Sequence, residues 1–277
     1  MTTAAYRPGG EEPAPPFHGG RHDRRRQAAY RPEVSLRAGA EEPAPPFHGG
    51  RHDRRRQAAY DSIADWYAGY VVEISDYSVR VHDMLRGLLG PGDGSVCLDI
   101  CCGTGARAAV VRQLGWRPIG VDISAGQLRH ARAEMPVVQG DATALPFGDG
   151  VAEAAICVLA HTDVPDYAAV VREASRVLRP GGVFVHIGVH PSFVGAFADR
   201  GDPAEVRVDA SYHRRDRRYD SFTPHGVRAK VGAWHTPLPD LLHAAIDAGL
   251  TVRRVVEGGP PGAVPDLFGF SSSSSPP

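Results

Sequence analysis

The middle of the chain alternates between short apolar runs and longer amphipathic stretches. The apolar runs are rich in Val and Ile, are flanked by Gly, Pro or Asp, and occupy residues 96–101, 119–123, 136–139, 154–160, 183–189 and 252–256. Short apolar runs of this kind are typical of strands buried on both faces of a parallel sheet. The stretches between them have the length and spacing of helices. We therefore expect strands and helices to alternate from Tyr60 onward.

Start and stop signals mark three of these helices. Ser124 with Gln127 forms a capping box, and a second helix has Pro165 near its first turn and residues 180–182 (PGG) as its stop. A third helix is expected over 239–248. Parallel strands joined by helices need right-handed crossovers. The predicted fold class is therefore α/β, a doubly wound, Rossmann-like and mostly parallel sheet with helices on both faces.

Both ends of the chain differ from this pattern. Residues 1–59 are rich in Pro, Gly and Arg, and residues 11–30 recur unchanged as 41–60, which indicates a recent duplication or an artefact. So few large apolar side chains cannot offset the entropy of ordering, and we expect disorder. A last strand near 263–269 is only weakly indicated, and 271–277 (SSSSSPP) is expected to be a low-complexity tail. The predicted domain is then 60–270.

Composition narrows the class of protein. A length of 277 residues and 42% hydrophobic content suit one α/β domain with a sizeable core. The first residues lack the apolar stretch of a secretory signal and no membrane segment is expected, so the prediction is a cytoplasmic protein with reduced thiols. The four cysteines are therefore expected to be neither disulfides nor metal ligands, and Cys97 and Cys157 to be small buried hydrophobes.

Charge argues against nucleic acid as a partner. Residues 1–59 hold 11 Arg against 7 acidic residues, while the whole chain has a net charge of −1, so the remainder is acidic. The arginine runs of the first segment would give only weak, salt-sensitive contacts to phosphate. A nucleic-acid partner is therefore not expected, and the oligomeric state stays open.

The stretch VCLDICCGTGARAA, residues 96–109, joins the first expected strand to the helix that follows it. Gly103 and Gly105 would let a ligand approach the backbone, and Asp99 would favour a cationic group over a pyrophosphate. At the ends of the next strands stand Asp122, where a carboxylate can bind both hydroxyls of a ribose, and Asp141. The pattern indicates a nucleoside ligand with a ribose and a positively charged tail.

Four motifs in order carry a family resemblance: LDICCGTG (98–105), GVDIS (120–124), GDATALPF (140–147) and EASRVLRPGG (173–182). Together they resemble the class I S-adenosylmethionine-dependent methyltransferases, especially those related to ubiquinone and menaquinone biosynthesis. YDSIADWYAGY, residues 60–70, looks like the N-terminal helix of that group. The resemblance implies S-adenosylmethionine as the cofactor and S-adenosylhomocysteine as the product.

The resemblance also implies a set of cofactor-binding residues. Asp99 and the loop from Gly103 to Gly105 would hold the amino-acid end, and Asp122 the ribose. Cys101 stands where the family commonly has Gly but is still small, and Cys102 stands where the family often has Cys. Both cysteines would therefore line the site. The remaining contacts would come from Ile123 packing on the adenine, Asp141 and Ala142 at the adenine edge, and Tyr60 and Tyr67 closing over the methionine part.

The methyl acceptor is expected beyond the fourth strand, under a cap. No Asn- or Asp-Pro-Pro-Tyr motif, as used on exocyclic amines, follows that strand; His161 and Asp163 occupy the place instead. Imidazole titrates near neutral pH, so His161 is the candidate general base, with Asp163 near enough in sequence to bias its tautomer. The alternative, a structural histidine bonded to the backbone, stays open.

Residues 190–237 are too long for an ordinary connection and are expected to form a substrate cap. Its candidate substrate-binding residues are His190, Phe193, Tyr212, Trp234 and His235. Such groups suit O- or C-methylation of a phenol-, quinone- or polyketide-like small molecule, as in secondary metabolism, although they can equally build the cap's own core.

Two other functions remain open at this stage. One is an S-adenosylmethionine-binding enzyme or regulator that transfers no methyl group. The other is a dinucleotide-binding oxidoreductase, which the missing G-x-G-x-x-G disfavours.

Overall fold

The computed structural model describes residues 58–73, 75–220 and 226–275. The chain divides into two units, Met1–His52 and Asp53–Pro277, and the description that follows concerns the second. The predicted disorder of residues 1–57, together with nearly all of the repeat, lies outside the described residues.

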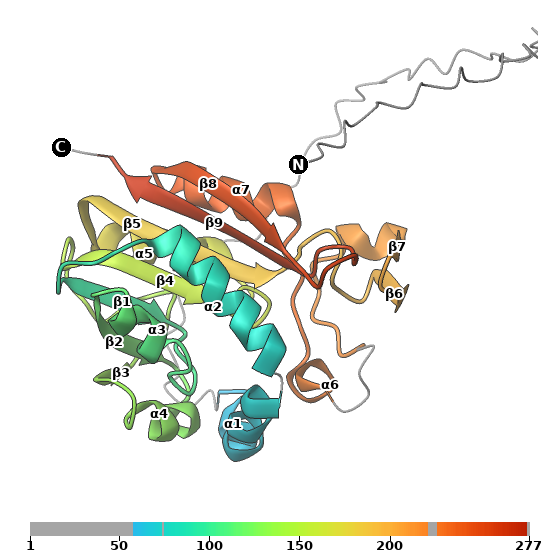
Figure 1. The fold of residues 1–277 in the computed structure, drawn as a ribbon, viewed down its shortest axis with the longest axis horizontal. Coiled ribbons are helices and arrows are strands. Elements are labelled where there is room, and N and C mark those ends of the chain that lie inside the picture. Colours follow the sequence, from blue (N-terminus) through green and yellow to red (C-terminus); the bar gives the residue numbers. More distant parts are fainter. Residues whose placement is uncertain (1–57, 74, 221–225, 276–277) are drawn as a thin grey trace, which may run out of the picture. The chain divides into compact units, whose positions relative to one another are not determined.

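A seven-stranded sheet forms the centre of the second unit (Figure 1). Its spatial order is β3-β2-β1-β4-β5-β9-β8, and the first five strands of that order are parallel. β9 lies antiparallel between β5 and β8. In chain order the strands are β1 Val96–Ile100, β2 Arg117–Asp122, β3 Val137–Gln139, β4 Ala152–Val158, β5 Leu178–Val189, β8 Leu250–Gly258 and β9 Leu267–Ser274. The doubly wound, mostly parallel α/β fold is confirmed.

β9 corrects the prediction at the C-terminal end of the chain. The strand begins at Leu267 and includes Ser271–Ser274, so these four serines are not a tail, and the weakly indicated strand at 263–269 begins too early. Ser272 is 1% exposed and is paired with Phe184 of β5 and Val252 of β8. Leu267, Phe268 and Phe270 anchor the first half of β9 in the core, and main-chain pairing with β5 and β8 continues the strand through the serines.

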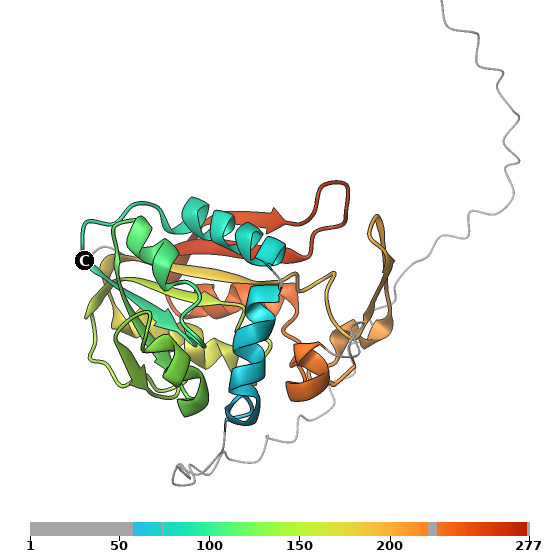
Figure 2. The same ribbon diagram turned by 60° about the horizontal axis from the view of Figure 1, so that its bottom comes forward.

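Helices cover both faces of the sheet (Figure 2). α2 (Ser75–Leu89) and α3 (Ala108–Gln113) pack with Cys97, Ile156 and Ile187 on one face. α5 (Tyr167–Val177) and α7 (Leu238–Asp247) pack with Leu98 and Phe184 on the other. The N-cap of α5 is Asp166, whose carboxylate accepts from the Ala169 N–H, so the helix begins just after Pro165. It ends at Val177 and β5 follows directly, so the predicted stop at residues 180–182 lies inside that strand. Cys97 and Cys157 are fully buried, as predicted.

The first described segment is anchored on α4 (Ala125–Ala131). It consists of a short 3₁₀ turn, η1 (Asp61–Ile63), followed by α1 (Ala64–Glu73). The Asp61 carboxylate accepts from the Ser124 hydroxyl at 2.6 Å and from the Gly126 N–H at 3.0 Å. Ser124 in turn accepts from the Gln127 N–H, which is half of the predicted capping box. The other half is not formed, because the Gln127 amide has no partner among the described residues.

The segment between β5 and α7 has secondary structure of its own. It contains a two-stranded sheet of β6 (Ala198–Asp202) and β7 (Glu205–Val208), then η2 (Ala210–His213) and α6 (Val227–Val231). It docks on the loop after β4 through the Trp234 N–H, which donates to the Thr162 carbonyl at 2.8 Å. The cap thus lies against the predicted acceptor position.

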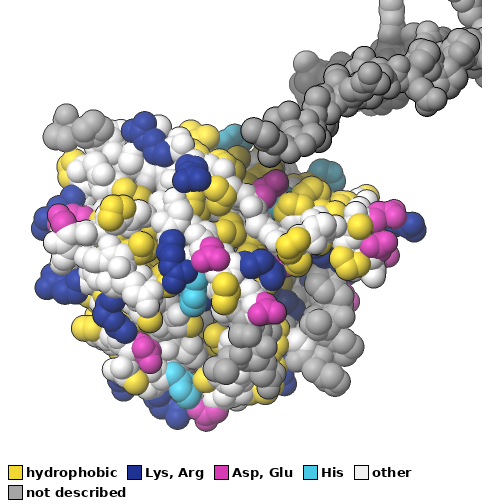
Figure 3. All heavy atoms as spheres, in the orientation of Figure 1, with side chains coloured by type: hydrophobic (Ala, Val, Ile, Leu, Met, Phe, Trp, Pro, Cys, Tyr) yellow, Lys and Arg dark blue, Asp and Glu magenta, His cyan; other side chains and the backbone are white. Residues whose placement is uncertain are grey.

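The surface of the second unit has a mixed character. Basic, acidic and apolar side chains are interspersed on the face shown in Figure 3. Within the described residues, no helix combines the length and the apolar character needed to cross a membrane.

Candidate cofactor and acceptor sites

A cavity of about 170 Å³, called here the small cavity, opens beyond the carboxyl ends of β1 and β2. Parallel α/β sheets bind ligands at this edge. Seven of the predicted cofactor-binding residues line it: Tyr60, Tyr67, Asp99, Cys101, Gly103, Asp122 and Ile123. Ala58 and Ala59 line it as well, so the folded part begins slightly before the expected boundary at residue 60.

Asp99 is the most unusual charged group of the small cavity. Its side chain is 2% exposed, and its Oδ2 has no hydrogen-bond partner among the described residues. Burial raises the pKa of this carboxyl to about 7, with Asp122 adding to the rise and Arg107 opposing it. A cationic ligand placed here would satisfy the carboxylate and offset the cost of burying it.

Asp122 ends β2 and is held by the turn around it. Its carboxylate accepts from the Gly103 N–H at 2.9 Å and from the Ser124 N–H at 2.8 Å. Burial still raises its pKa above the usual value. Next to it, Ile123 is 47% exposed, an apolar side chain at the rim of the cavity. This arrangement suits a ribose hydroxyl pair beside an adenine ring.

The two adjacent cysteines are part of the cavity wall. Cys101 has φ of +59°, a conformation that glycine adopts without strain and that costs other residues about 1–2 kcal/mol. The side-chain interaction with Cys157, together with burial, raises the pKa of the Cys101 thiol, and burial raises that of Cys102. Both thiols are therefore protonated near neutral pH. No group of three metal-ligating side chains occurs among the described residues.

Three predicted cofactor residues are not among those lining the small cavity. A Cβ on Gly105 would lie 3.1 Å from Glu134 and 3.2 Å from Ala131, so this glycine allows close packing against α4. Asp141 accepts from the Thr143 N–H and hydroxyl, and Ala142 belongs to the core. Contact of Asp141 and Ala142 with an adenine edge stays a prediction.

Two residues of the small cavity were missed in the sequence. Arg107, 8% exposed, donates from Nη1 to Nε2 of His82 at 2.8 Å and has no carboxylate partner among the described residues. Gln127, 2% exposed, has both amide atoms unpartnered within the described residues. Both are polar groups able to bind a ligand's carboxylate and polar edge. A lone arginine at the start of an apolar helix was the available signal.

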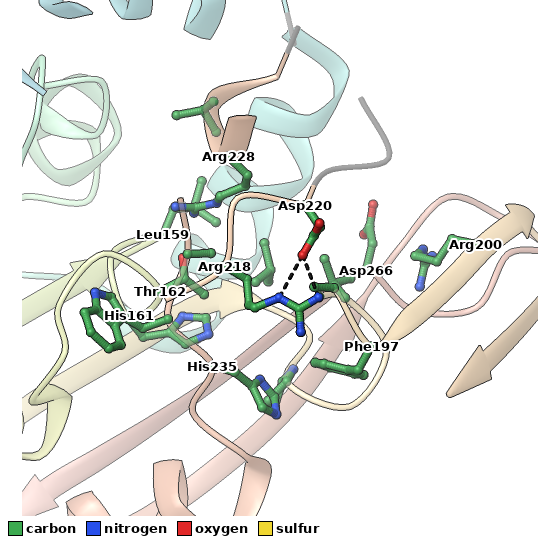
Figure 4. A pocket seen from close by; sticks show the side chains of 18 of the residues that line it. Leu159, His161, Thr162, Phe197, Arg200, Arg218, Asp220, Arg228, His235 and Asp266 are labelled. Atoms are coloured by element: carbon green, nitrogen blue, oxygen red, sulfur yellow. Dashed lines mark hydrogen bonds and ion pairs between the residues drawn. The ribbon is translucent and has the colours of Figure 1, made fainter. Parts of the chain in front are cut away.

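A second cavity of about 420 Å³, called here the large cavity, lies under the cap (Figure 4). Its size is within the range of small-molecule sites. Tyr60, Tyr67 and Leu159 line both cavities, so the two are adjacent. Aromatic side chains of the large cavity include Tyr70, Tyr77, Phe197 and Trp234, and charged side chains, most of them arginines, line it as well.

His161 stands in the wall of the large cavity, as predicted for a base. It is 1% exposed, and burial, with His186 and Arg228 nearby, lowers its pKa well below 6.5. Its Nδ1 lies against Gly188 of β5, where an added Cβ would be 2.3 Å away. Nε2 is therefore the nitrogen that can face an acceptor.

The predicted role of Asp163 in orienting His161 is wrong. The Asp163 carboxylate accepts from the Tyr60 hydroxyl at 3.1 Å and from Arg228 Nη1 at 2.5 Å. Both partners come from other elements, the first described segment and α6 of the cap. Asp163 thus joins these elements to the loop after β4, and its charge is neutralised by Arg228 rather than used on the imidazole.

The predicted substrate-binding residues of the cap fall into two groups. Trp234 and His235 line the large cavity; His190, Phe193 and Tyr212 are not among its lining residues. His190 accepts from the Ser192 N–H at Nδ1 and reaches Glu257 at 2.9 Å through Nε2, so both nitrogens are engaged. Phe193 stacks on His190, and Tyr212 packs edge-on against Phe197. These three side chains pack within the cap, which agrees with the alternative that they build the cap's own core.

The arginines of the large cavity were also missed. Arg218 is paired with Asp220, as Figure 4 shows, and Arg214 with Asp216. Arg200 donates to the carbonyls of Phe193 and Val264 and has no carboxylate partner among the described residues. In the sequence these arginines are indistinguishable from a solvated charged run, and only the folding of the cap places them at a cavity.

The comparisons with known proteins agree with this geometry. Residues 98–186 match the family described as a methyltransferase domain. A demethylmenaquinone methyltransferase of Mycolicibacterium paratuberculosis is 39% identical over 101 residues, which are 36% of this chain and 44% of that protein. The chain thus matches less than half the length of this curated relative.

Solved structures show the same fold over more of the chain. An S-adenosylmethionine-dependent methyltransferase from Mesorhizobium loti has a TM-score of 0.59 at 23% identity, covering 69% of this chain and 96% of that one. A [4+2]-cyclase has a TM-score of 0.51 at 18% identity, covering 72% and 81%. The second unit therefore has the fold of these solved structures, residues 98–186 are similar to the methyltransferase domain, and the predicted resemblance to the menaquinone-related group is confirmed.

Proposed function

We propose that this protein transfers a methyl group from S-adenosylmethionine to a small molecule held in the large cavity. The observation that carries the proposal is the pair of adjacent cavities that share Tyr60, Tyr67 and Leu159. The small cavity has the acidic groups that a cationic nucleoside requires, and the large one has an apolar wall with a buried imidazole. A cofactor and an acceptor bound in these two places would meet at the shared residues.

The residues of the small cavity fit the cofactor. Asp99, with its unpartnered buried oxygen, would bind the ammonium group, and the Arg107 guanidinium the carboxylate. Asp122 would accept from the ribose hydroxyls, and Ile123 would cover the adenine. The Cys101 backbone, held in its left-handed turn, leaves room for the methionine part.

When bound, S-adenosylmethionine supplies the methyl group of its sulfonium: the acceptor forms the new bond to the methyl carbon, and the C–S bond breaks with its electron pair on sulfur. The leaving group is S-adenosylhomocysteine. Tyr60, Tyr67 and Leu159 would hold the acceptor in line with that bond and exclude water. For an acceptor that loses a proton, His161 Nε2 would take it and later release it to solvent. Trp234 and His235 would contact the acceptor, for which a phenol- or quinone-like ring is our candidate, in line with the menaquinone-related sequence match.

The cofactor assignment is tested by calorimetry on Asp122→Ala. Loss of the ribose bonds should weaken S-adenosylmethionine binding by about 2–3 kcal/mol. Asp149→Ala, which changes an exposed carboxylate paired with Arg176, is the matched control and should bind normally. Thermal melting without ligand checks that both variants are folded. Equal affinities for the two variants would reject the assignment.

The transfer itself is tested by following S-adenosylhomocysteine formation with a panel of phenols, naphthols and quinols. With an acceptor found, His161→Gln should bind cofactor normally and turn over about 10²–10⁴ times more slowly. Turnover within about threefold of the unchanged protein would remove His161 as the base. Tight cofactor binding without product from any acceptor would favour the alternative, a cofactor-binding protein that transfers no methyl group.

A further inference from the structure

A row of two buried side chains, His186 and Tyr167, packs against His161, and neither is among the residues that line the large cavity. His186 of β5 is fully buried, and its Nδ1 is 2.7 Å from the Tyr167 hydroxyl of α5. The His186 and His161 rings meet edge to face with their centroids 5.2 Å apart. Two imidazoles thus connect α5 to the wall of the large cavity.

Two ring nitrogens of this row have no hydrogen-bond partner among the described residues: Nδ1 of His161 and Nε2 of His186. Both face Gly188, where a Cβ would lie 2.3 Å from the first and 3.1 Å from the second. A buried polar atom that remains unpaired is destabilising, because it has lost its hydrogen bonds to water without replacing them. Two such atoms at one spot are explained together if they share a hydrogen bond, made directly or through one water.

Both rings are neutral near pH 7, because burial lowers the pKa of His161 well below its usual value and that of His186 to about 3. A neutral imidazole has one N–H and one lone pair, and the position of the proton decides which nitrogen can act as a base. The partner of Nδ1 therefore controls whether Nε2 of His161 is a base or a donor.

We propose that His186, held by Tyr167, fixes the tautomer of His161 in which Nδ1 carries the proton. His161 Nδ1–H then donates to His186 Nε2, and His186 Nδ1–H donates to the Tyr167 oxygen. Nε2 of His161 keeps its lone pair for the acceptor. His186 and Tyr167 are thus positioning residues, and this role rests on the proposed function.

The tautomer can be observed without any turnover. Protein labelled with ¹⁵N-histidine is examined by long-range ¹H–¹⁵N correlation at pH 7, and the His161 and His186 signals are assigned from His161→Gln and His186→Gln. A proton on Nδ1 and a bare Nε2 in His161 are expected. A proton on Nε2 of His161 would overturn the proposal. Because this readout needs no acceptor, it stands even if the methyl transfer proposed above fails.

A matched pair of variants then tests His186. In His186→Gln the amide oxygen can accept from His161 Nδ1–H while the amide N–H donates to Tyr167, so turnover should stay within a few-fold. His186→Phe keeps a flat ring of similar size but removes the acceptor, and kcat should fall roughly 10- to 100-fold, less than the ~10²–10⁴ of losing the base itself.

Cofactor affinity and the KM for the acceptor should be unchanged in both variants, since His186 is not among the residues that line either cavity. Equal kcat values for folded His186→Gln and His186→Phe would overturn the proposal. If His186→Phe fails to fold, the tautomer measurement on the unchanged protein still decides the question.

Discussion

At the scale of single residues, Asp99 has the property that is easiest to test. Its carboxyl is buried with one unpartnered oxygen, and its pKa is about 7 in the protein alone. In most molecules the Asp99 carboxyl is therefore protonated at pH 6 and ionised at pH 8. A bound ammonium group would lower this pKa, because an adjacent positive charge favours the ionised form.

The expected result is that S-adenosylmethionine binding releases a proton from Asp99. Release should be larger at pH 6 than at pH 8, because the carboxyl of the unliganded protein carries its proton mainly at the lower pH. The measurement is calorimetry in buffers that differ in ionisation enthalpy. Asp99→Asn, which has no proton to lose, should abolish the pH-dependent part. Release that persists in Asp99→Asn would place the titrating group elsewhere.

Single residues of the site also differ in how far the sequence could predict their roles. Asp99, Asp122 and Gly103 were predictable because a glycine turn after a strand places its neighbours at the ligand-binding edge of the sheet. The role of Asp163 was not, since its partners Tyr60 and Arg228 lie 103 and 65 residues away in the chain. Local spacing suggested His161 as the partner of Asp163, whereas long-range packing supplied a guanidinium and a phenol instead.

At the scale of elements, strands with apolar runs were predicted within a few residues, whereas only the first residues of β9 were indicated, and weakly. A sequence pattern indicates a strand through its side chains, and Ser271–Ser274 offer none that are apolar. What holds the serine half of β9 is its position between β5 and β8, where its backbone is paired on both sides. Such a strand can only be recognised once its neighbours are known.

This account predicts that Ser272→Pro is strongly destabilising. Proline removes an N–H from a strand that is flanked on both sides, and we expect a loss of about 3 kcal/mol or more in the free energy of unfolding. Ser272→Ala, which keeps the N–H, should cost less than about 1 kcal/mol. Urea denaturation of the two variants makes the comparison. Equal midpoints would show that residues 271–274 are a tail after all.

At the scale of the whole molecule, the two cavities are assembled from segments far apart in the chain. The small cavity takes residues from the first described segment, the β1 and β2 turns and the cap, with Asp61 and Asp163 as the joining carboxylates. Neither carboxylate joins neighbours in sequence. Binding at the cavities and the integrity of the first segment should therefore be coupled.

Two truncations test this coupling. Composition predicts that residues 1–57 add no core, so a chain beginning at Ala58 should keep its melting temperature and its affinity for S-adenosylmethionine. A chain beginning at Ile63 retains α1 but loses Tyr60 and Asp61, and with them the bonds to Asp163, Ser124 and Gly126. Hydrogen bonds to charged groups contribute about 1.5–3 kcal/mol each, so this chain should melt lower and bind cofactor at least ~10-fold more weakly.

The measurements are calorimetric melting and titration on both chains. A loss of stability already at Ala58 would show that the repeat-containing segment packs on the domain, and equal affinity in the two chains would show that Tyr60 and Asp61 do not organise the small cavity.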